Sequence, residues 1–414
     1  MKYGCIGEHL THSFSKEIHS HIASYDYEIC ELRPDEVDGF MTKRDFLAIN
    51  VTIPYKETVI PYLSYVDESA RLIGAVNTIV NKDGKLFGYN TDFYGMDSLL
   101  KRTEIELEGK KVLILGSGGT AKTAFAVATA NNAREIVKVS RKSSKDTVLY
   151  TDVYKLHTDA EIIINTTPVG MFPNNYNKPI DISKFPNLVG VLDAIYNPNS
   201  TELILDAKAR GIKASGGLYM LVMQGIKASE YFLDTKYDIA LADEVYSKIE
   251  AEKKNVVLIG MPASGKSTVG KLIAERLSRV FTDTDDMIVT EAKSSISEIF
   301  DTYGEAVFRD IESEAVKKAS IQSSLVIATG GGAVLRKENL DALKQNGKIY
   351  FLDRPLDMLI PTDDRPTAST REAIEKRYSE RYSIYCESAD KIIDASATPD
   401  IIADKIISDF LSGV

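Results

Sequence analysis

One stretch in the second half of the chain limits the possible fold more than any other feature. Residues 255–268 read NVVLIGMPASGKST, an apolar run followed by the pattern G-x-x-x-x-G-K-[ST]. Such a loop follows a buried strand and opens a helix, because its backbone N–H groups must cradle phosphates. We therefore predict a nucleoside-triphosphate site in which Lys266 reaches the phosphates and Ser267 contacts Mg²⁺. The expected nucleotide contacts come from Gly260, Ala263, Ser264, Gly265, Lys266, Ser267 and Thr268.

Short apolar runs alternate with helical stretches along most of the chain. This alternation is typical of α/β folds with parallel sheets, so the predicted fold class is α/β. The expected strands lie at 111–115, 135–139, 162–165, 189–193, 256–259, 325–328 and 349–352.

The composition argues against several kinds of partner and location. Apolar residues make up 44% of the chain and charged residues 27%, as in ordinary globular proteins. The net charge of −10 argues against nucleic acid as a partner. No apolar run reaches about 18 residues, so no membrane span is expected. The three cysteines fit no disulfide or zinc spacing and no signal-peptide pattern opens the chain, which together predict a cytoplasmic protein.

A second, different nucleotide loop lies in the first half. Residues 116–121 read GSGGTA, a variant of G-x-G-x-x-G/A between an expected strand and an expected helix at 121–130. The glycines of this pattern let the backbone approach a pyrophosphate at the helix N-terminus. We therefore expect a dinucleotide site formed by Gly116, Ser117, Gly118, Gly119, Thr120 and Ala121.

The strand after this loop ends in a serine and two cations, Ser140, Arg141 and Lys142. NAD-binding folds carry an acidic residue at this place, where it binds the ribose hydroxyls. Arg141 would instead bind a 2′-phosphate, which favours NADP over NAD. A solvent-facing basic turn is the alternative interpretation.

At about 100–200 residues per domain, a chain of 414 residues is expected to form two to four domains. We expect an α/β lobe at 1–100, completed by helices at about 217–250. A Rossmann-like NADP lobe at 101–216 and a P-loop domain at 254–414 follow.

Several segments of the first half resemble shikimate dehydrogenase, across about residues 1–250. They are HSFS at 12–15, NVTIPYK at 50–56, GAVNT at 74–78, GYNTD at 88–92, NTTPVGM at 165–171, DAIY at 193–196 and GLYMLVMQ at 217–224. The resemblance implies reduction of 3-dehydroshikimate to shikimate with NADP(H). A lysine held near a carboxylate can relay a proton, and the family pattern implies that Lys56 is the acid/base and Asp92 its partner.

The same resemblance implies the remaining contacts of this half. A polyhydroxy substrate needs hydroxyl and amide partners, and the matching positions are Ser13, Ser15, Thr52, Asn77, Tyr196 and Gln224. Asn165 and Thr166 would lie near the ribose and nicotinamide, which Gly217 would also approach. Turn and capping roles are the alternative for the polar residues. Lys16 and Ser20 depart from the family pattern beside the substrate serines.

The second half resembles shikimate kinase, across about residues 254–414. The matching segments are FTDTD at 281–285, FR-x-x-E at 308–312, GGG at 330–332, DRP at 364–366 and RYSIY at 381–385. The resemblance implies phosphorylation of shikimate with ATP and Mg²⁺. The implied contacts are Asp283 to the metal, Asp285 to the attacking hydroxyl, Arg309 and Arg381 to the acceptor carboxylate, Gly331 and Gly332 beside it, and Arg365 from a lid.

Two alternatives remain for this half. Asp283 and Asp285 would be surface turn residues in one, and Arg309 with Glu312 would form a helix-surface salt bridge in the other. Two positions depart from the family pattern: the lid reads DRPTA at 364–368, and Ala263 replaces a common P-loop glycine.

Together the two halves predict a bifunctional enzyme of the shikimate pathway, which leads to chorismate and the aromatic amino acids. The product of the first half would be the acceptor of the second, and this argues against quinate as the substrate of the dehydrogenase. The alternatives are a dehydrogenase with a degenerate kinase half and a metabolite-sensing pseudoenzyme. The expected partners are the two small substrates, and nothing in the sequence indicates an oligomer.

Overall fold

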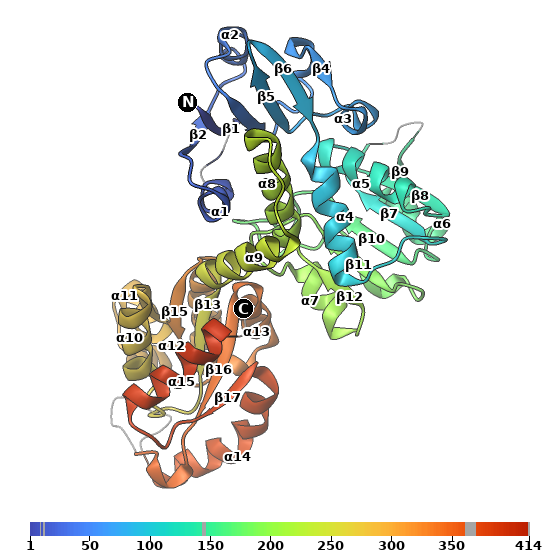
Figure 1. The fold of residues 1–414 in the computed structure, drawn as a ribbon. Helices are drawn as coiled ribbons and strands as arrows, with labels where there is room; N and C mark the ends of the chain where they lie inside the picture. Colours follow the sequence, from blue (N-terminus) through green and yellow to red (C-terminus); the bar gives the residue numbers. More distant parts are fainter. Residues whose placement is uncertain (9, 11–12, 143–145, 361–369, 413–414) are drawn as a thin grey trace. The chain divides into compact units, whose positions relative to one another are not determined.

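The computed structural model describes all residues except 9, 11–12, 143–145, 361–369 and 413–414 (Figure 1). The chain divides into two compact units, Met1–Ile249 and Glu250–Val414. Helix α9 (Ile239–Lys253) contains the boundary, and β13 starts two residues after it, at Asn255. Both units are α/β, which confirms the predicted fold class. No helix in the described residues is long and apolar enough to cross a membrane.

The first sheet of unit 1 is mixed. Its strand order is β2-β1-β3-β5-β6-β4, with β5 antiparallel to both β3 and β6. The reversal between β5 and β6 arises at Asp83 and Gly84, whose φ angles of 52° and 79° form a two-residue hairpin turn. The strands are β1 (Tyr3–Gly7), β2 (Tyr27–Glu31), β3 (Ala48–Val51), β4 (Tyr65–Val66), β5 (Thr78–Lys82) and β6 (Lys85–Tyr89).

The second sheet of unit 1 is parallel throughout. Its order is β12-β11-β10-β7-β8-β9. Strands β8 and β9 are therefore added on one side of β7, and β10, β11 and β12 on the other. The predicted strands of this region are confirmed to within one residue at each end. The strands are β7 (Lys111–Leu115), β8 (Glu135–Ser140), β9 (Val148–Leu149), β10 (Ile162–Asn165), β11 (Gly190–Asp193) and β12 (Lys213–Ser215).

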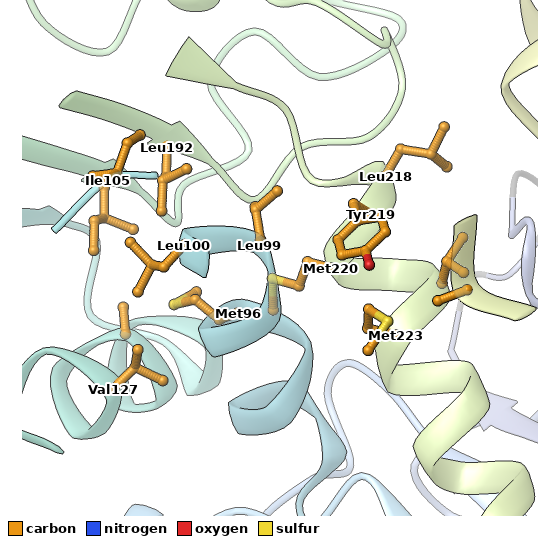
Figure 2. Packing of buried hydrophobic residues seen from close by; sticks show 14 of the residues in the cluster. Met96, Leu99, Leu100, Ile105, Val127, Leu192, Leu218, Tyr219, Met220 and Met223 are labelled. Carbon is orange, nitrogen blue, oxygen red and sulfur yellow. The ribbon is translucent and has the colours of Figure 1, made fainter. Parts of the chain in front are cut away.

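One apolar core joins the long helices of unit 1 to this second sheet. Figure 2 shows Met96, Leu99 and Leu100 of α4 packed among side chains of α5, β11 and α8. Helix α8 also packs on α1, β3 and β5, so it contacts the first sheet as well. The helices of unit 1 are α1 (Ser15–Ile22), α2 (Val37–Lys43), α3 (Glu68–Ile73), α4 (Thr91–Thr103), α5 (Gly119–Ala130), α6 (Tyr150–Leu156), α7 (Glu202–Ala209) and α8 (Leu218–Leu233).

Unit 2 is built on a parallel sheet with the order β14-β15-β13-β16-β17. Its strands are β13 (Asn255–Ile259), β14 (Val280–Asp283), β15 (Leu325–Ala328), β16 (Gly347–Asp353) and β17 (Lys391–Asp394). Its helices are α10 (Lys266–Leu277), α11 (Thr284–Ala292), α12 (Ile296–Ser320), α13 (Lys337–Asn346), α14 (Arg371–Ser388) and α15 (Pro399–Ser412). Helix α12 is kinked at Gly304, where φ is 80°.

Candidate functional sites

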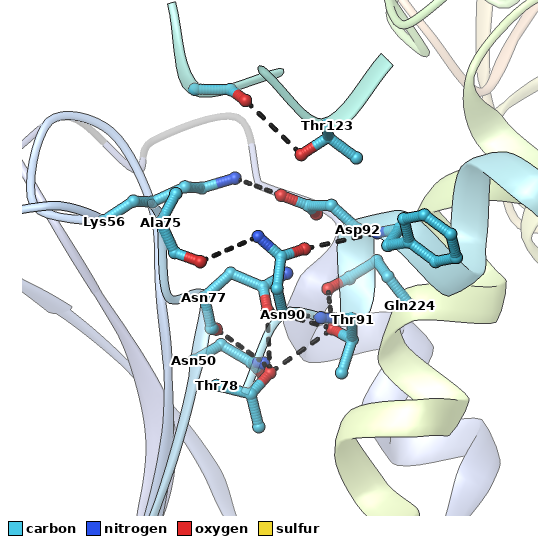
Figure 3. Close-up of polar contacts among 12 residues, drawn as sticks. Asn50, Lys56, Ala75, Asn77, Thr78, Asn90, Thr91, Asp92, Thr123 and Gln224 are labelled. Carbon is cyan, nitrogen blue, oxygen red and sulfur yellow. Dashed lines mark hydrogen bonds and ion pairs between the residues drawn. The ribbon is translucent and has the colours of Figure 1, made fainter. Parts of the chain in front are cut away.

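A lysine and a carboxylate meet in the first unit. Lys56 lies in the loop after β3 and Asp92 in the first turn of α4, and Lys56 Nζ lies 2.5 Å from Asp92 Oδ2 (Figure 3). The side chains are only 15% and 12% exposed, so the ion pair is well shielded from water. Asn90 fixes the start of α4 because its Oδ1 caps Phe93 N and its Nδ2 donates to Ala75 O. The pair can hold and move a proton.

A network of neutral side chains lies beside this pair (Figure 3). Asn77 Oδ1 accepts from Thr91 N at 2.7 Å and lies 3.2 Å from Thr91 Oγ1. Thr91 Oγ1 also lies 3.4 Å from Gln224 Oε1 on α8. Two predicted substrate residues, Asn77 and Gln224, are thus brought together by a threonine that sequence reasoning did not select.

Asn50 is a second residue that sequence reasoning missed, although it opens the NVTIPYK segment. It is buried, accepts from Tyr27 Oη at 2.7 Å and donates to Thr78 Oγ1 at 3.1 Å. Its amide also donates to Asn77 O at 3.3 Å, so Asn50 helps to fix the backbone at Asn77, as a buried amide with satisfied partners does. Its place within a matched motif was the only signal that could have identified it.

The predicted substrate hydroxyls lie at the start of α1 and in the loop after β11. Ser13 Oγ donates to Ser15 Oγ at 3.0 Å and accepts from Ser15 N. Phe14 stands between the two serines in the sequence, and the centroid of its ring lies 5.1 Å from that of the Tyr196 ring. Burial raises the pKa of Tyr196 to about 12, so its hydroxyl stays protonated and can donate. Thr52 is half-buried, and its N–H donates to Ile6 O of β1.

The first nucleotide loop lies directly beside Lys56. Gly116 follows β7 with a φ of 119°, and a Cβ there would lie 2.6 Å from Thr166 Oγ1. Helix α5 begins at Gly119 without a side-chain cap, which leaves N–H groups for an anion. A Cβ on Gly119 would lie 3.8 Å from Lys56 Cδ. The N-terminus of α5 and the side chain of Lys56 therefore lie side by side.

The cationic end of β8 faces a tyrosine. Ser140 Oγ accepts from Lys142 N at 3.3 Å, and Arg141 and Lys142 are exposed. Burial raises the pKa of Tyr150, and the Arg141 guanidinium opposes that shift, which places Arg141 near the phenol. The residues fit a 2′-phosphate because the guanidinium is accessible and no acidic side chain occupies the end of the strand.

The amide of Asn165 is held by hydrogen bonds to neighbouring protein groups. It is fully buried, donates to Asp193 Oδ1 at 3.0 Å and accepts from Thr167 N at 3.0 Å. Asp193 Oδ2 accepts from Thr201 Oγ1, the cap of α7, at 2.7 Å. The side chain of Asn165 thus fixes the loop that presents Thr166, whose hydroxyl donates to Leu115 O. Gly217 has its N–H bonded to Ile195 O, and a Cβ there would overlap Ala194 O.

Asp193 gives the first unit a testable dependence on pH. Burial raises its pKa from the ordinary 3.8 to about 6, against three hydrogen bonds that favour the carboxylate. A folded-state pKa above the unfolded value means that the stabilising contribution of the neutral acid is complete below about pH 4 and is lost as pH rises through 6. From pH 4 to 7 the wild-type unit should lose about 3 kcal/mol of unfolding free energy relative to Asp193→Asn. Amide hydrogen exchange in β10 and β11 measures this, and parallel pH curves would contradict it.

The P-loop of the second unit is already closed around its own lysine. Lys266 Nζ donates to Gly260 O and Met261 O, both at 2.9 Å. Gly265 has a φ of 92° and Ala263 a φ of 62°. The left-handed conformation costs an alanine roughly 1 kcal/mol, so the replacement noted in the sequence is strained but adopts the loop geometry.

A serine and a carboxylate meet at the end of β14. Ser267 Oγ donates to Asp283 Oδ2 at 2.6 Å, and Asp283 Oδ1 caps α11 through Asp285 N. In the described residues no three His, Cys, Asp or Glu side chains gather as a metal cage. Mg²⁺ is usually bound by one or two protein oxygens together with waters and phosphates. Ser267 and Asp283 fit that requirement.

The predicted acceptor arginines are buried on the same side of the sheet. Arg309 Nη1 donates to Glu312 Oε2 at 2.8 Å, and Glu312 is only 1% exposed. The pair is therefore not the helix-surface salt bridge of the alternative interpretation. Burial raises the pKa of Glu312 despite Arg309, and Asp285 raises it further, which places the Asp285 carboxylate nearby. Arg381 Nη1 donates to Gly331 O at 3.1 Å.

The glycine turn, Gly330 to Gly332, has no room for side chains, because groups of neighbouring residues already fill the space around it. A Cβ on Gly330 would lie 2.5 Å from Asp285 Oδ1 and 2.8 Å from Glu312 Oε1. One on Gly331 would lie 2.9 Å from Pro262, and one on Gly332 would overlap the Arg309 guanidinium. The turn thus brings its backbone to within contact distance of the P-loop, the carboxylates and the arginine.

The other predicted residues of this half differ in how far they are buried, and one lies outside the described residues. Ser264 is buried and Thr268 is exposed at the start of α10. Arg365 and the lid segment 364–368 lie outside the described residues. The strands β13, β14 and β15 all end at the site described above, as expected for ligand sites at the carboxyl edge of parallel sheets.

Comparison with protein families identifies both halves. The family model for the shikimate dehydrogenase substrate binding domain matches residues 5–79, and the family model for shikimate kinase matches residues 262–411.

Curated relatives match the first half over almost their whole length. A shikimate dehydrogenase (NADP(+)) of Clostridium perfringens is 35% identical over 266 residues, covering 60% of this chain and 98% of the relative. The enzyme of the same name from Geobacillus kaustophilus is 38% identical over 250 residues, covering 55% and 91%.

Solved structures give the same result. Shikimate dehydrogenase 1 from Peptoclostridium difficile is 35% identical with a TM-score of 0.56, covering 60% of this chain and 98% of that structure. A chorismate mutase/shikimate 5-dehydrogenase fusion protein from Clostridium acetobutylicum is 34% identical with a TM-score of 0.57, covering 60% and 96%. A shikimate 5-dehydrogenase from Thermus thermophilus in complex with NADP(H) and shikimate is 28% identical with a TM-score of 0.54, covering 60% and 99%.

Proposed function

Because this chain belongs to the shikimate dehydrogenase family and carries a shikimate kinase domain, we propose a specific role for each side chain of its two sites. The protein is a bifunctional shikimate-pathway enzyme with NADP(H) and ATP as cofactors, the latter with Mg²⁺. We infer that the first unit reduces 3-dehydroshikimate to shikimate and that the second phosphorylates shikimate at its 3-hydroxyl.

In the first unit Lys56 is the acid that protonates the reduced ketone oxygen. Gly119 and Gly217 would lie against NADPH, which would supply the hydride when bound. Asp92, 2.5 Å from Lys56 Nζ, holds the ammonium in place and keeps it charged until the proton moves. Asn77 and Gln224 bind the substrate hydroxyls, with Ser13, Ser15, Thr52 and Tyr196 completing the set.

In the second unit the side chains position two reactants more than they react themselves. Arg309 and Arg381 hold the acceptor carboxylate, and Asp285 orients the attacking hydroxyl and accepts its proton. Lys266 leaves the loop carbonyls to bind the phosphates. Ser267 and Asp283 would hold Mg²⁺, whose charge would neutralise that of the transferring group.

One observation carries the proposal: each nucleotide loop lies beside charged side chains suited to its reaction, Lys56 with Asp92 in the first unit and Asp283, Asp285 and Arg309 in the second. A single-tube assay tests it, with 3-dehydroshikimate, NADPH, ATP and Mg²⁺, following NADPH and ADP together. We expect one ADP for each NADPH consumed. Consumption of NADPH without ADP would remove the kinase role, and a protein that formed ADP only when shikimate was added would lack the reductase role.

The preference for NADP is expected to depend on Arg141. Replacing it with alanine removes a charge-assisted contact to the 2′-phosphate, worth about 1.5–3 kcal/mol. The kcat/KM for NADPH should fall about tenfold or more, while that for NADH should change little. Lys138→Ala is the matched control, because it removes an equal charge from the same strand. The Lys138 ammonium lies over the ring of Phe125, with Nζ 5.0 Å from the ring centroid. Equal losses in both variants would assign the preference to overall charge instead.

A cytoplasmic location is also part of this proposal. Cys5, Cys30 and Cys386 are free thiols, which suits a reducing compartment where NADPH and ATP are both available. The partners we infer are the small substrates alone.

A further inference from the structure

Two side chains of α14 donate to the same backbone oxygen in the glycine turn. Tyr385 Oη donates to Gly331 O at 2.5 Å, and Arg381 Nη1 donates to it at 3.1 Å. Tyr385 is fully buried and its ring stacks on Phe351, with centroids 5.0 Å apart and planes inclined by 16°. The phenol therefore has little freedom to move away from the carbonyl.

A fixed carbonyl also fixes the next N–H. The peptide bond between Gly331 and Gly332 is trans, so the Gly332 N–H points opposite to the Gly331 carbonyl and away from α14. Within the described part of the chain, neither the Gly331 N–H nor the Gly332 N–H donates to a protein group. By contrast, the Gly330 N–H donates to Thr284 Oγ1 at 3.0 Å.

The free N–H of Gly332 lies beside the acceptor arginine, because a Cβ on Gly332 would overlap the Arg309 guanidinium. A peptide between two glycines has no side chain to resist rotation about its flanking bonds. Rotated by half a turn, it would present a carbonyl oxygen to a site built for a carboxylate and hydroxyls. Its orientation must therefore be set from outside the turn.

We propose that Tyr385 is a positioning residue of the kinase half, whose hydroxyl holds the Gly331–Gly332 peptide so that the Gly332 N–H donates to the bound acceptor. This inference rests on the proposed phosphorylation of shikimate. Arg381 cannot supply the same restraint alone, because its guanidinium must also turn toward the acceptor carboxylate. The Tyr385 hydroxyl has no such second task at the acceptor and donates to the Gly331 carbonyl.

The same helix provides a matched control. Tyr382 also packs on Phe351, with centroids 5.9 Å apart, and its hydroxyl donates to Asp353 Oδ2 at 3.0 Å, away from the glycine turn. Tyr382→Phe and Tyr385→Phe each delete one oxygen and one hydrogen bond on α14. Only the second removes a hydrogen bond from the Gly331 carbonyl, so a purely structural role for the hydroxyl would affect both variants alike.

The test compares the two variants in the full-length protein. For Tyr385→Phe we expect the KM for shikimate in phosphorylation to rise about tenfold, the effect of one poorly oriented buried hydrogen bond. The KM for ATP and the rate of ketone reduction should stay at the wild-type values. Tyr382→Phe should leave all three unchanged.

Hydrogen exchange of the peptide that contains residues 330–332 gives a second measurement. Adding shikimate with ADP should protect this peptide in the wild type and in Tyr382→Phe but not in Tyr385→Phe. Protection that requires ADP together with shikimate assigns the signal to the kinase site, because ADP is a nucleotide of the P-loop. Equal KM values and equal protection in the two variants would overturn the role of Tyr385 alone. A wild type with neither ADP formation nor protection would overturn the proposed phosphorylation and this inference with it.

Discussion

Replacing Lys56 with alanine is expected to abolish ketone reduction and leave phosphorylation intact. A positioned proton donor contributes about 100- to 10,000-fold to such a step, and the structure offers no second ammonium on Asp92 Oδ2 among the described residues. Initial rates of NADPH oxidation and of ADP formation, measured separately on the same preparation, give the result.

Lys101→Ala is the control for this variant. Lys101 lies on α4, like Asp92, and pairs with Asp97, but its side chain is 75% exposed. Removing an exposed pair costs little, so both activities should be retained. If Lys56→Ala lost both activities while remaining folded, the assignment of one reaction to each unit would be wrong.

Replacing Lys266 with alanine should produce the opposite pattern. Lys266 is 6% exposed and its ammonium already lies in the P-loop, bonded to two loop carbonyls. Loss of one preorganised charge at the transferring phosphate costs about 100- to 1,000-fold in kcat. ADP formation from shikimate and ATP should fall by that factor, while the kcat for reduction of 3-dehydroshikimate should not change.

The control for this second variant is on the same helix. Lys271 is exposed and lies 5.8 Å from the ring of Phe281, so Lys271→Ala removes an equal charge outside the loop. Retention of phosphorylation by Lys266→Ala would exclude the P-loop as the phosphate site, and a comparable loss in Lys271→Ala would point to helix stability instead.

The sequence predicted the parallel sheets because their strands are buried on both faces and read as short apolar runs. The second sheet of unit 1 and the sheet of unit 2 follow that pattern closely. The first sheet was not predicted in this detail. Its β5–β6 pair follows from the Asp83–Gly84 turn, a local signal between two short strands, whereas its β3–β5 pair joins strands that are far apart in the sequence.

Charged site residues could be predicted from the sequence more readily than neutral ones. Lys56 and Asp92 are 36 residues apart, and a family pattern was enough to pair them. The roles of Asn50, Thr91 and Tyr385 depend on which donor meets which acceptor across the fold. No spacing in the sequence specifies such a contact, because each of these residue types also occurs often in turns and cores, where it has no role in a site.

The protein contacts of Asn165 could not be predicted from the sequence either. The family pattern implied a place near the cofactor, which stays a prediction, and the structure shows the amide in a buried network with Asp193. A buried carboxylate at the end of β11 attracts the nearest donors, and this local requirement decides where the amide points. The residue next to it, Thr166, is the one whose hydroxyl lies at the glycine loop.

The glycine positions of the second unit differ in how much mutational drift they can tolerate. At Gly330, Gly331 and Gly332 even a methyl group would collide with a carboxylate, a proline ring or a guanidinium, so a natural variant there would displace groups of the kinase site and lower the rate of phosphorylation. At position 263 the demand comes from backbone torsion alone, and the partly exposed alanine meets it at a modest energetic cost. Related chains can therefore exchange small residues at position 263 and keep their nucleotide pocket, whereas selection should hold the triplet invariant.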